Sequence, residues 1–367
     1  MVPGSRYKTP APLLRAFPPP DYLTMPAVGI DISDYAIKHM LIKRRGRHFY
    51  LASVGKVDLP LGVIEGGEIK DEETIVKLLT RIRDEYGYEH AHISLPEAHA
   101  YLFQLELPSD GSADTEQLVE FHLKEHVPLG ADEAVFDYNV FESRDRNFVV
   151  NVSVYPAVIA EQYARLVEEA GFVVLSSELE GHATARALLS HTHSEPTIIV
   201  DIGRSEASFS ISVNGTVTFT ASLDIGGDQF TRAIARGMDV SFQEAEHLKH
   251  TYGFRDLPES DAVYKALAPH MNEFKEAINR HFVYWQMHAS VGDVNDVSRI
   301  ILVGGNANMP GLPEFLSATL EARVDVGNVW TNMFSFHEYI PNVHKKASLE
   351  FATAAGLAMR SLLRSSA

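Results

Sequence analysis

The chain has 367 residues, 45% of them hydrophobic, with a formal net charge of -17 and no cysteine. This length favours two or more domains, and the lack of cysteine excludes disulfides and thiolate metal sites. The acidic balance disfavours nucleic acid and anionic membrane surfaces as partners, because like charges repel.

The N-terminal 25 residues are rich in proline and are predicted to form a disordered tail. They lack the apolar run of a signal peptide, and no later stretch has the length and apolarity of a membrane-spanning helix. We therefore expect a cytoplasmic protein with no direct membrane insertion.

The first ordered block begins at residue 27. Residues 27–32, 36–43 and 48–57 have the pattern of three successive strands. Residues 71–86 then place Ile75 and Ile82 on one face of an amphipathic helix.

The next block, residues 89–156, combines strand patterns with one helix over 114–126. Asp114 is a plausible N-cap for that helix, and Pro128 ends it. The block is predicted to be a small inserted α+β unit. A helix over 157–170, a strand over 172–176 and a helix over 179–190 follow.

The opening pattern then returns, with strands over 197–201, 207–213 and 216–223. The first strand of each copy ends in a similar way, as GIDIS at 29–33 and as IVDIG at 199–203. An internal repeat of this size is more informative than a single motif.

Helical patterns dominate the remainder, at 228–236, 241–251 and 261–288. A buried strand over 299–303 runs into Gly304 and Gly305 and is followed by a helix over 312–320. The last helix is predicted over 349–363.

The repeated Asp-Ile-small sequence indicates phosphate chemistry. Backbone N–H groups of a tight turn can hold phosphate oxygens, and a small residue allows an anion to approach. Asp31 and Asp201, at the two strand ends, can each hold hydrated Mg²⁺ against those phosphates. One hairpin alone would favour an ordinary turn with a well-placed Asp, but two facing hairpins can clamp a triphosphate.

The order of hairpin, connecting helix, second hairpin, helical region and Gly-Gly turn resembles the actin, Hsp70 and sugar-kinase superfamily. Within it, the insert with EFHLKEHVPL at 120–129 and VFDY at 135–138 resembles the PilM family, in the FtsA/PilM branch. The resemblance covers residues 27–362. It implies an α/β, actin-like (ribonuclease H-like) two-lobe ATPase fold with an inserted SHS2-type subdomain. The implied domains are lobe I at 26–88, 157–190 and 346–363, the insert at 89–156, and lobe II at 191–345 with a helical subdomain at about 240–296.

The resemblance also implies a site for ATP and Mg²⁺. Magnesium would be held through water by Asp31 and Asp201, and Glu180 matches a carboxylate that positions water in related ATPases. Glu246 and Lys249 match a helix that holds ribose and adenine, although a solvated Glu-Lys pair has the same spacing. The implied nucleotide-binding residues are Asp31, Ser33, Lys38, Asp201, Gly203, Ser205, Gly226, Gly227, Glu246, Lys249, Gly304, Gly305 and Met309.

The sequence departs from the family pattern in both hairpins. Ser33 and Asp34 stand where the family usually has glycine or small residues, and Asp34 would add negative charge beside a triphosphate. The second hairpin reads GRSE at 203–206, where Gly-x-x-Thr-Thr is commoner in the family. We therefore expect at most a slow ATPase and not a metabolic enzyme.

The implied role is a scaffold of type IV pilus assembly. It would dock the N-terminal tail of an inner-membrane PilN-type protein in a groove beside the insert, where the acidic balance suits a basic tail. Three alternatives stay open: a peptide-binding scaffold without nucleotide, an FtsA-like filament protein and a small-molecule kinase of the same superfamily. The filament protein is disfavoured because the sequence stops directly after the last predicted helix.

Overall fold

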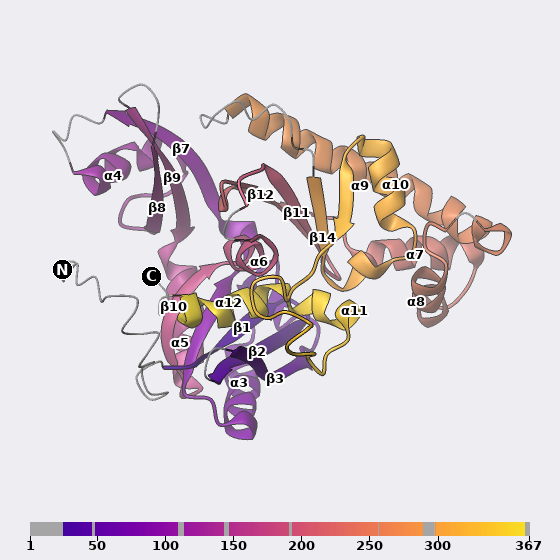
Figure 1. Ribbon diagram of the computed structural model, residues 1–367, viewed down its shortest axis with the longest axis horizontal. Coiled ribbons are helices and arrows are strands. Elements are labelled where there is room, and N and C mark those ends of the chain that lie inside the picture. Colours follow the sequence, from indigo (N-terminus) through magenta and orange to yellow (C-terminus); the bar gives the residue numbers. More distant parts are fainter. Residues whose placement is uncertain are drawn as a thin grey trace.

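A computed structural model describes residues 25–45, 48–108, 114–142, 147–190, 193–255, 257–288, 297 and 299–363. The tail predicted over residues 1–25 lies outside this part of the chain, apart from Met25. Two five-stranded sheets form the centres of two lobes, and a three-stranded sheet with one helix projects from them (Figure 1). The predicted two-lobe α/β fold with an insert is confirmed.

The first sheet has the order β10-β6-β1-β2-β3. Strand β1 pairs antiparallel with β2 and parallel with β6, and β6 pairs parallel with β10. The strands are β1 (Ala27–Ser33), β2 (Ala36–Arg45), β3 (His48–Asp58), β6 (His90–Leu95) and β10 (Val173–Leu179).

The second sheet has the order β13-β12-β11-β14-β15 and repeats this arrangement. Strand β11 pairs antiparallel with β12 and parallel with β14, as β1 does with β2 and β6. The strands are β11 (Thr197–Ile202), β12 (Ala207–Val213), β13 (Thr216–Leu223), β14 (Arg299–Val303) and β15 (Arg323–Val326). The internal repeat in the sequence thus corresponds to two equivalent hairpins in space.

Four helices cover the first sheet: α3 (Glu72–Tyr86), α5 (Ala157–Glu169), α6 (Glu180–Leu188) and α12 (Ala352–Leu363). Helix α3 begins where Asp71 accepts a hydrogen bond from the Thr74 amide at 3.0 Å, and it ends at Gly87 with φ of 68°. Helices α3 and α5 share a core with β1 and β6. Helices α6 and α12 belong instead to the core that continues into lobe II.

The insert consists of β7 (Tyr101–Pro108), α4 (Thr115–His126), β8 (Ala134–Glu142) and β9 (Asn147–Pro156), in the sheet order β7-β9-β8. The boundary predicted at residue 89 differs from the structure. Strand β6 lies between β1 and β10 in the first sheet, so the three-stranded sheet begins only at β7. A hairpin of β4 (Ile64–Glu65) and β5 (Glu68–Ile69) and the short helix η1 (Glu97–His99) lie near this junction.

The helical part of lobe II begins earlier than residue 240, because α7 packs against both α8 and α9. Its helices are α7 (Gly227–Met238), α8 (Phe242–Thr251), η2 (Pro258–Ser260) and α9 (Asp261–His288). The remaining elements are η3 (Gly305–Asn308), α10 (Leu312–Leu320), α11 (Lys345–Ser348) and η4 (Leu349–Phe351). Within the described ranges, no helix combines the length and apolarity needed to cross a membrane.

Candidate functional site

A cleft of about 450 Å³ lies between the two lobes. The β1–β2 turn and the β11–β12 turn face each other across it, and the starts of α7 and η3 close one side. It brings together most of the residues that the sequence nominated: Asp31, Ser33, Lys38, Glu180, Asp201, Gly203, Ser205, Gly227, Glu246, Lys249, Gly304 and Gly305.

Asp31 and Lys38 form an ion pair in the floor of the cleft. The Lys38 Nζ lies 3.1 Å from Asp31 Oδ2, while Ser94 Oγ donates to Asp31 Oδ1 at 3.0 Å. Burial alone would lower the pKa of Lys38, but the surrounding carboxylates of Asp31, Asp201 and Glu180 raise it. Lys38 therefore stays charged in the cleft.

Two carboxyl groups beside Lys38, those of Asp201 and Glu180, have raised pKa values. Burial raises the pKa of Asp201 to about 6, although Lys38 opposes the shift. Burial and the nearby carboxylates of Asp31 and Glu97 raise the pKa of Glu180 well above its ordinary value. Around Lys38, the three carboxyl groups of Asp31, Asp201 and Glu180 thus outnumber the single ammonium group.

Asp34 does not add to this charge in the way the sequence indicated. Its carboxylate accepts hydrogen bonds from the amides of Gly66 and Gly67, at 2.8 and 3.0 Å, and so ties the β1–β2 turn to the β4–β5 turn. Although Asp34 lines the cleft, two backbone N–H groups compensate its charge.

Lys249 lines the cleft but is almost fully buried. Its side chain is only 1% exposed, and its Nζ contacts Glu246 at 2.8 Å and Thr231 Oγ1 at 2.9 Å. Burial would raise the pKa of Glu246, but hydrogen bonds from His250, Lys249 and Thr231 lower it to about 2. Lys249 thus positions Glu246, whose half-exposed carboxylate faces the cleft.

The predicted glycines have different structural roles. A Cβ on Gly226 would lie 2.4 Å from the Ser205 carbonyl carbon, so this residue allows α7 to approach the second hairpin. Gly304 has φ of 87°, and a Cβ there would lie 2.3 Å from Asp201 Oδ1. Only Gly305 of these three faces open space. Neither Gly226 nor Met309, which is 1% exposed, lines the cleft.

Several lining residues were not nominated from the sequence. Asn306 donates to the Gly203 carbonyl at 2.8 Å and thereby joins the Gly-Gly turn to the second hairpin. Lys56 of β3 pairs with Glu350 of η4 at 3.1 Å. Asn306 lies within the nominated turn, whereas no local pattern distinguishes Lys56 or Glu350.

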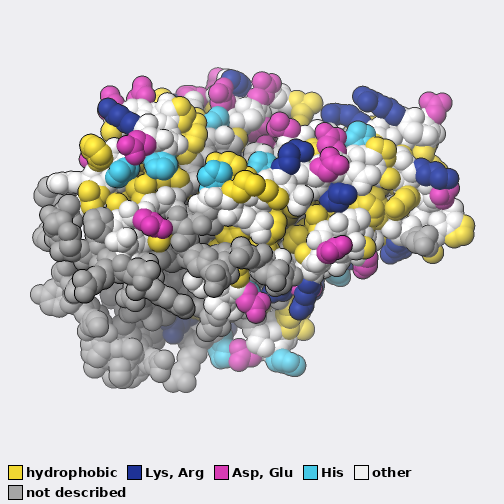
Figure 2. All heavy atoms as spheres, turned by 90° about the horizontal axis from the view of Figure 1, so that it is seen from above, with side chains coloured by type: hydrophobic (Ala, Val, Ile, Leu, Met, Phe, Trp, Pro, Cys, Tyr) yellow, Lys and Arg dark blue, Asp and Glu magenta, His cyan; other side chains and the backbone are white. Residues whose placement is uncertain are grey.

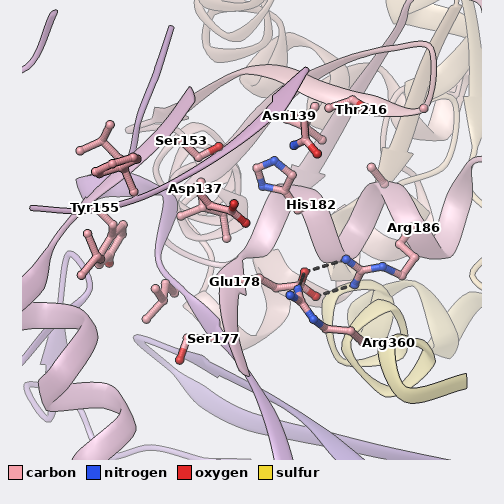
Figure 3. A pocket seen from close by; sticks show the side chains of 18 of the residues that line it. Asp137, Asn139, Ser153, Tyr155, Ser177, Glu178, His182, Arg186, Thr216 and Arg360 are labelled. Atoms are coloured by element: carbon pink, nitrogen blue, oxygen red, sulfur yellow. Dashed lines mark hydrogen bonds and ion pairs between the residues drawn. The ribbon is translucent and has the colours of Figure 1, made fainter. Parts of the chain in front are cut away.

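A second and larger cavity, of about 810 Å³, lies beside the insert. We call it the insert groove. It is lined by β8 and β9 of the insert, by β10, α6 and α12 of lobe I, and by residues 214–217 of lobe II. In its wall, the Glu178 carboxylate lies between the guanidinium groups of Arg186 and Arg360 (Figure 3).

The chain matches a family model described as type IV pilus assembly protein PilM over residues 29–362. Among curated relatives, FtsA of Bacillus subtilis strain 168 is 24% identical over 187 residues, and FtsA of Enterococcus hirae is 22% identical over 224 residues. These matches cover 46% and 51% of the chain, and 42% and 48% of the relatives' own lengths. The chain therefore spans less than half the length of these relatives.

Solved structures support the fold. A PilM-PilN type IV pilus biogenesis complex has a TM-score of 0.76 at 20% identity, and covers 92% of this chain and 98% of that one. MreB5 of Spiroplasma citri bound to ADP has a TM-score of 0.56 at 11% identity, with coverage of 92% and 96%. The sequence match across both lobes and the insert, together with this fold, places the chain in the PilM family of type IV pilus assembly proteins.

Proposed function

We propose that this protein is a cytoplasmic ATP-binding scaffold of type IV pilus assembly. It docks the N-terminal tail of a PilN-type inner-membrane protein and stays peripheral to the membrane through that partner. The observation that carries the proposal is the convergence of two hairpins, a lysine and a Gly-Gly turn on one cleft, in a chain that matches the PilM family from residue 29 to residue 362.

The cleft residues fit the parts of Mg-ATP. Lys38 and the turns carrying Ser33 and Ser205 suit the phosphates. The open space at Gly305 and the carboxylate of Glu246 suit the base and ribose. Magnesium with ATP usually takes one or two protein carboxylates and completes its shell with phosphate oxygens and water, and Asp31 and Asp201 provide such a pair.

Hydrolysis in this cleft is slow. Burial and the nearby carboxylates favour the protonated form of the Glu180 carboxyl by raising its pKa, and only the ionised form can accept the proton of an attacking water. The cleft therefore suits retention of ATP better than its turnover.

The ATP site is tested by calorimetric titration of Mg-ATP into the protein. Asp201→Ala removes one of the two magnesium carboxylates and is expected to weaken binding at least about tenfold, a loss typical of charged hydrogen-bonding groups. Asp84→Ala, on the exposed face of α3, is the matched control. Unchanged binding in Asp201→Ala would refute this site. Absence of ATP binding in the wild type, with a docked peptide, would favour the scaffold without nucleotide.

The insert groove is the proposed docking site for the tail. Strand β8 pairs with β9 on one side only among the described strands, so its other edge is available to an extended peptide. Tyr155 lines the groove and is 4% exposed, yet its hydroxyl has no hydrogen-bond partner within the described residues. A peptide carbonyl supplies the missing acceptor if docking uncovers this hydroxyl, which protein atoms cover in the structure.

The insert groove does not share the net negative charge of the whole chain. Its charged lining has two carboxylates, Asp137 and Glu178, and two guanidinium groups, Arg186 and Arg360, so the charges balance. Figure 3 shows Glu178 between the two arginines. Burial lowers the pKa of His182 to about 4, which keeps it neutral. On the face of the molecule in Figure 2, acidic and basic side chains are likewise interspersed. Apolar contacts and backbone hydrogen bonds, more than attraction of basic residues, therefore select the tail.

Docking is tested by fluorescence anisotropy with a labelled peptide of the PilN-type tail. Tyr155→Phe removes only the hydroxyl and is expected to weaken binding about three- to tenfold. A scrambled peptide is the control for composition. Equal affinity for the scrambled and native peptides, with folded protein, would overturn the docking proposal.

A further inference from the structure

Tyr35 and Arg204 contact each other across the mouth of the cleft. Tyr35 lies in the β1–β2 turn of lobe I, and Arg204 lies in the β11–β12 turn of lobe II. The Arg204 Cζ lies 4.8 Å from the centroid of the Tyr35 ring, within the range of a cation–π interaction. Both residues line the cleft, and the Arg204 side chain is 55% exposed, so the contact lies at the entrance and not in the floor.

Each side of this contact is held by its own lobe. The Tyr35 carbonyl accepts a hydrogen bond from the Leu59 amide at 2.8 Å, and the preceding Asp34 is bound to the β4–β5 turn. On the other side, Arg204 Nε donates to Asp228 Oδ1 at 3.1 Å, and the Asp228 amide donates to the Arg204 carbonyl at 2.9 Å. The ring and the guanidinium therefore move with their lobes, and separation of the lobes at the entrance must break the contact.

We propose that Tyr35 and Arg204 form a latch that controls how fast nucleotide enters and leaves the cleft. This inference rests on the proposed binding of ATP. The latch joins the two lobes across the mouth of the cleft, and a nucleotide must pass it in both directions. A contact that is broken only during passage changes the association and dissociation rates by the same factor and leaves the affinity unchanged. A residue that holds phosphate directly would change mainly the dissociation rate.

The kinetic test uses stopped-flow fluorescence with a mant-labelled ATP and Mg²⁺. Tyr35→Ala removes the ring and is expected to raise both rate constants about two- to fivefold, the factor that corresponds to an exposed cation–π contact. Its Kd should stay within about twofold of the wild type, because both rates change together. Tyr35→Phe keeps the aromatic face and should behave as the wild type. Unchanged rates in Tyr35→Ala, or a change in dissociation alone, would overturn the latch.

A second test needs no nucleotide. The chain has no cysteine, so Lys77→Cys on α3 and Ala318→Cys on α10 provide the sole attachment points for two spin labels, both at exposed positions. With the latch intact, the distance distribution between the lobes should be narrow, and Tyr35→Ala should broaden it or shift it to longer distances. Identical distributions would refute the latch. If the wild type binds no ATP, the proposed nucleotide site fails, while this measurement still decides whether the contact restrains the lobes.

Discussion

Asp201 offers a quantitative test of the electrostatics of the cleft. Its pKa is raised from 3.8 to about 6, chiefly by burial. At 1.36 kcal/mol per pKa unit, this shift corresponds to roughly 3 kcal/mol. Because the folded-state pKa is the higher one, the folded protein binds this proton more tightly than the unfolded chain does. Its stability therefore falls as the pH rises from about 4 to above 6.

Asp201→Asn keeps the size and shape of the side chain but cannot ionise. Without nucleotide, we expect this variant to be about 1–3 kcal/mol more stable than the wild type at pH 8, with the difference vanishing near pH 4. Its affinity for Mg-ATP should fall at the same time, because the amide is a poorer partner for hydrated magnesium. The site would then be one at which the folded protein loses stability in order to bind its ligand.

Urea denaturation followed by tryptophan fluorescence at pH 4, 6 and 8 measures this difference. Asp84→Asn, which changes an exposed carboxylate on α3, controls for the change in net charge. A variant that is less stable than the wild type at pH 8, or a difference that does not vary with pH, would refute the reasoning, since either outcome requires a cause other than the ionisation of Asp201.

Four further outcomes are expected. Mg-ATP affinity measured by calorimetry should decrease as the pH falls through about 6, because protonated Asp201 no longer attracts magnesium; constant affinity down to pH 5 would contradict this. Glu97→Ala should lower the free energy of unfolding by about 2–4 kcal/mol, because the Gly181 amide and the Thr220 hydroxyl lose a buried acceptor. Glu97→Gln should lower it by less than half as much. Equal losses would show that the shape of the side chain, and not its hydrogen bonds, determines the stability at this position. Glu178→Ala should destabilise the fold by about 3 kcal/mol in thermal and urea denaturation, since two guanidinium groups are left facing each other; a loss below about 1 kcal/mol would speak against the ion cluster. The affinity for the peptide should fall less than about threefold between 0.05 and 0.5 M salt, because the charges that line the groove balance. A steep salt dependence would instead indicate that electrostatic attraction selects a basic tail.

Local patterns predicted the parts of the fold whose determinants are close in sequence. The two hairpins follow from an apolar strand that ends in Asp-Ile-small and a tight turn, and the structure has equivalent strands at β1–β2 and β11–β12. Helix α3 was predictable because its cap at Asp71 and its apolar face lie within one short segment. The candidate cleft followed from the family resemblance more than from any single motif.

The parts of the fold that local patterns did not predict depend on contacts between residues that are distant in the sequence. The sequence of β6 would fit a strand of the first sheet or a strand of the insert equally well. Only its pairing with β1 assigns it to lobe I. The turn whose amides donate hydrogen bonds to Asp34 lies 32 residues further along the chain. Glu97 receives its hydrogen bond from Thr220 across 123 residues. Such partners are set by the assembled lobes, so no local pattern could indicate them.

The C-terminal helix α12 has a consequence for biosynthesis. It packs against β1 and α6 so closely that a Cβ on Gly29 would lie 2.2 Å from the Ala354 carbonyl oxygen, and one on Gly356 would lie 1.7 Å from the Ala183 carbonyl oxygen. The face of the first sheet that α12 covers is therefore bare until the ribosome has made the chain up to this helix. The strands of lobe II, which end at residue 326, are available to one another earlier. During translation, the lobe that begins first is thus expected to finish folding last.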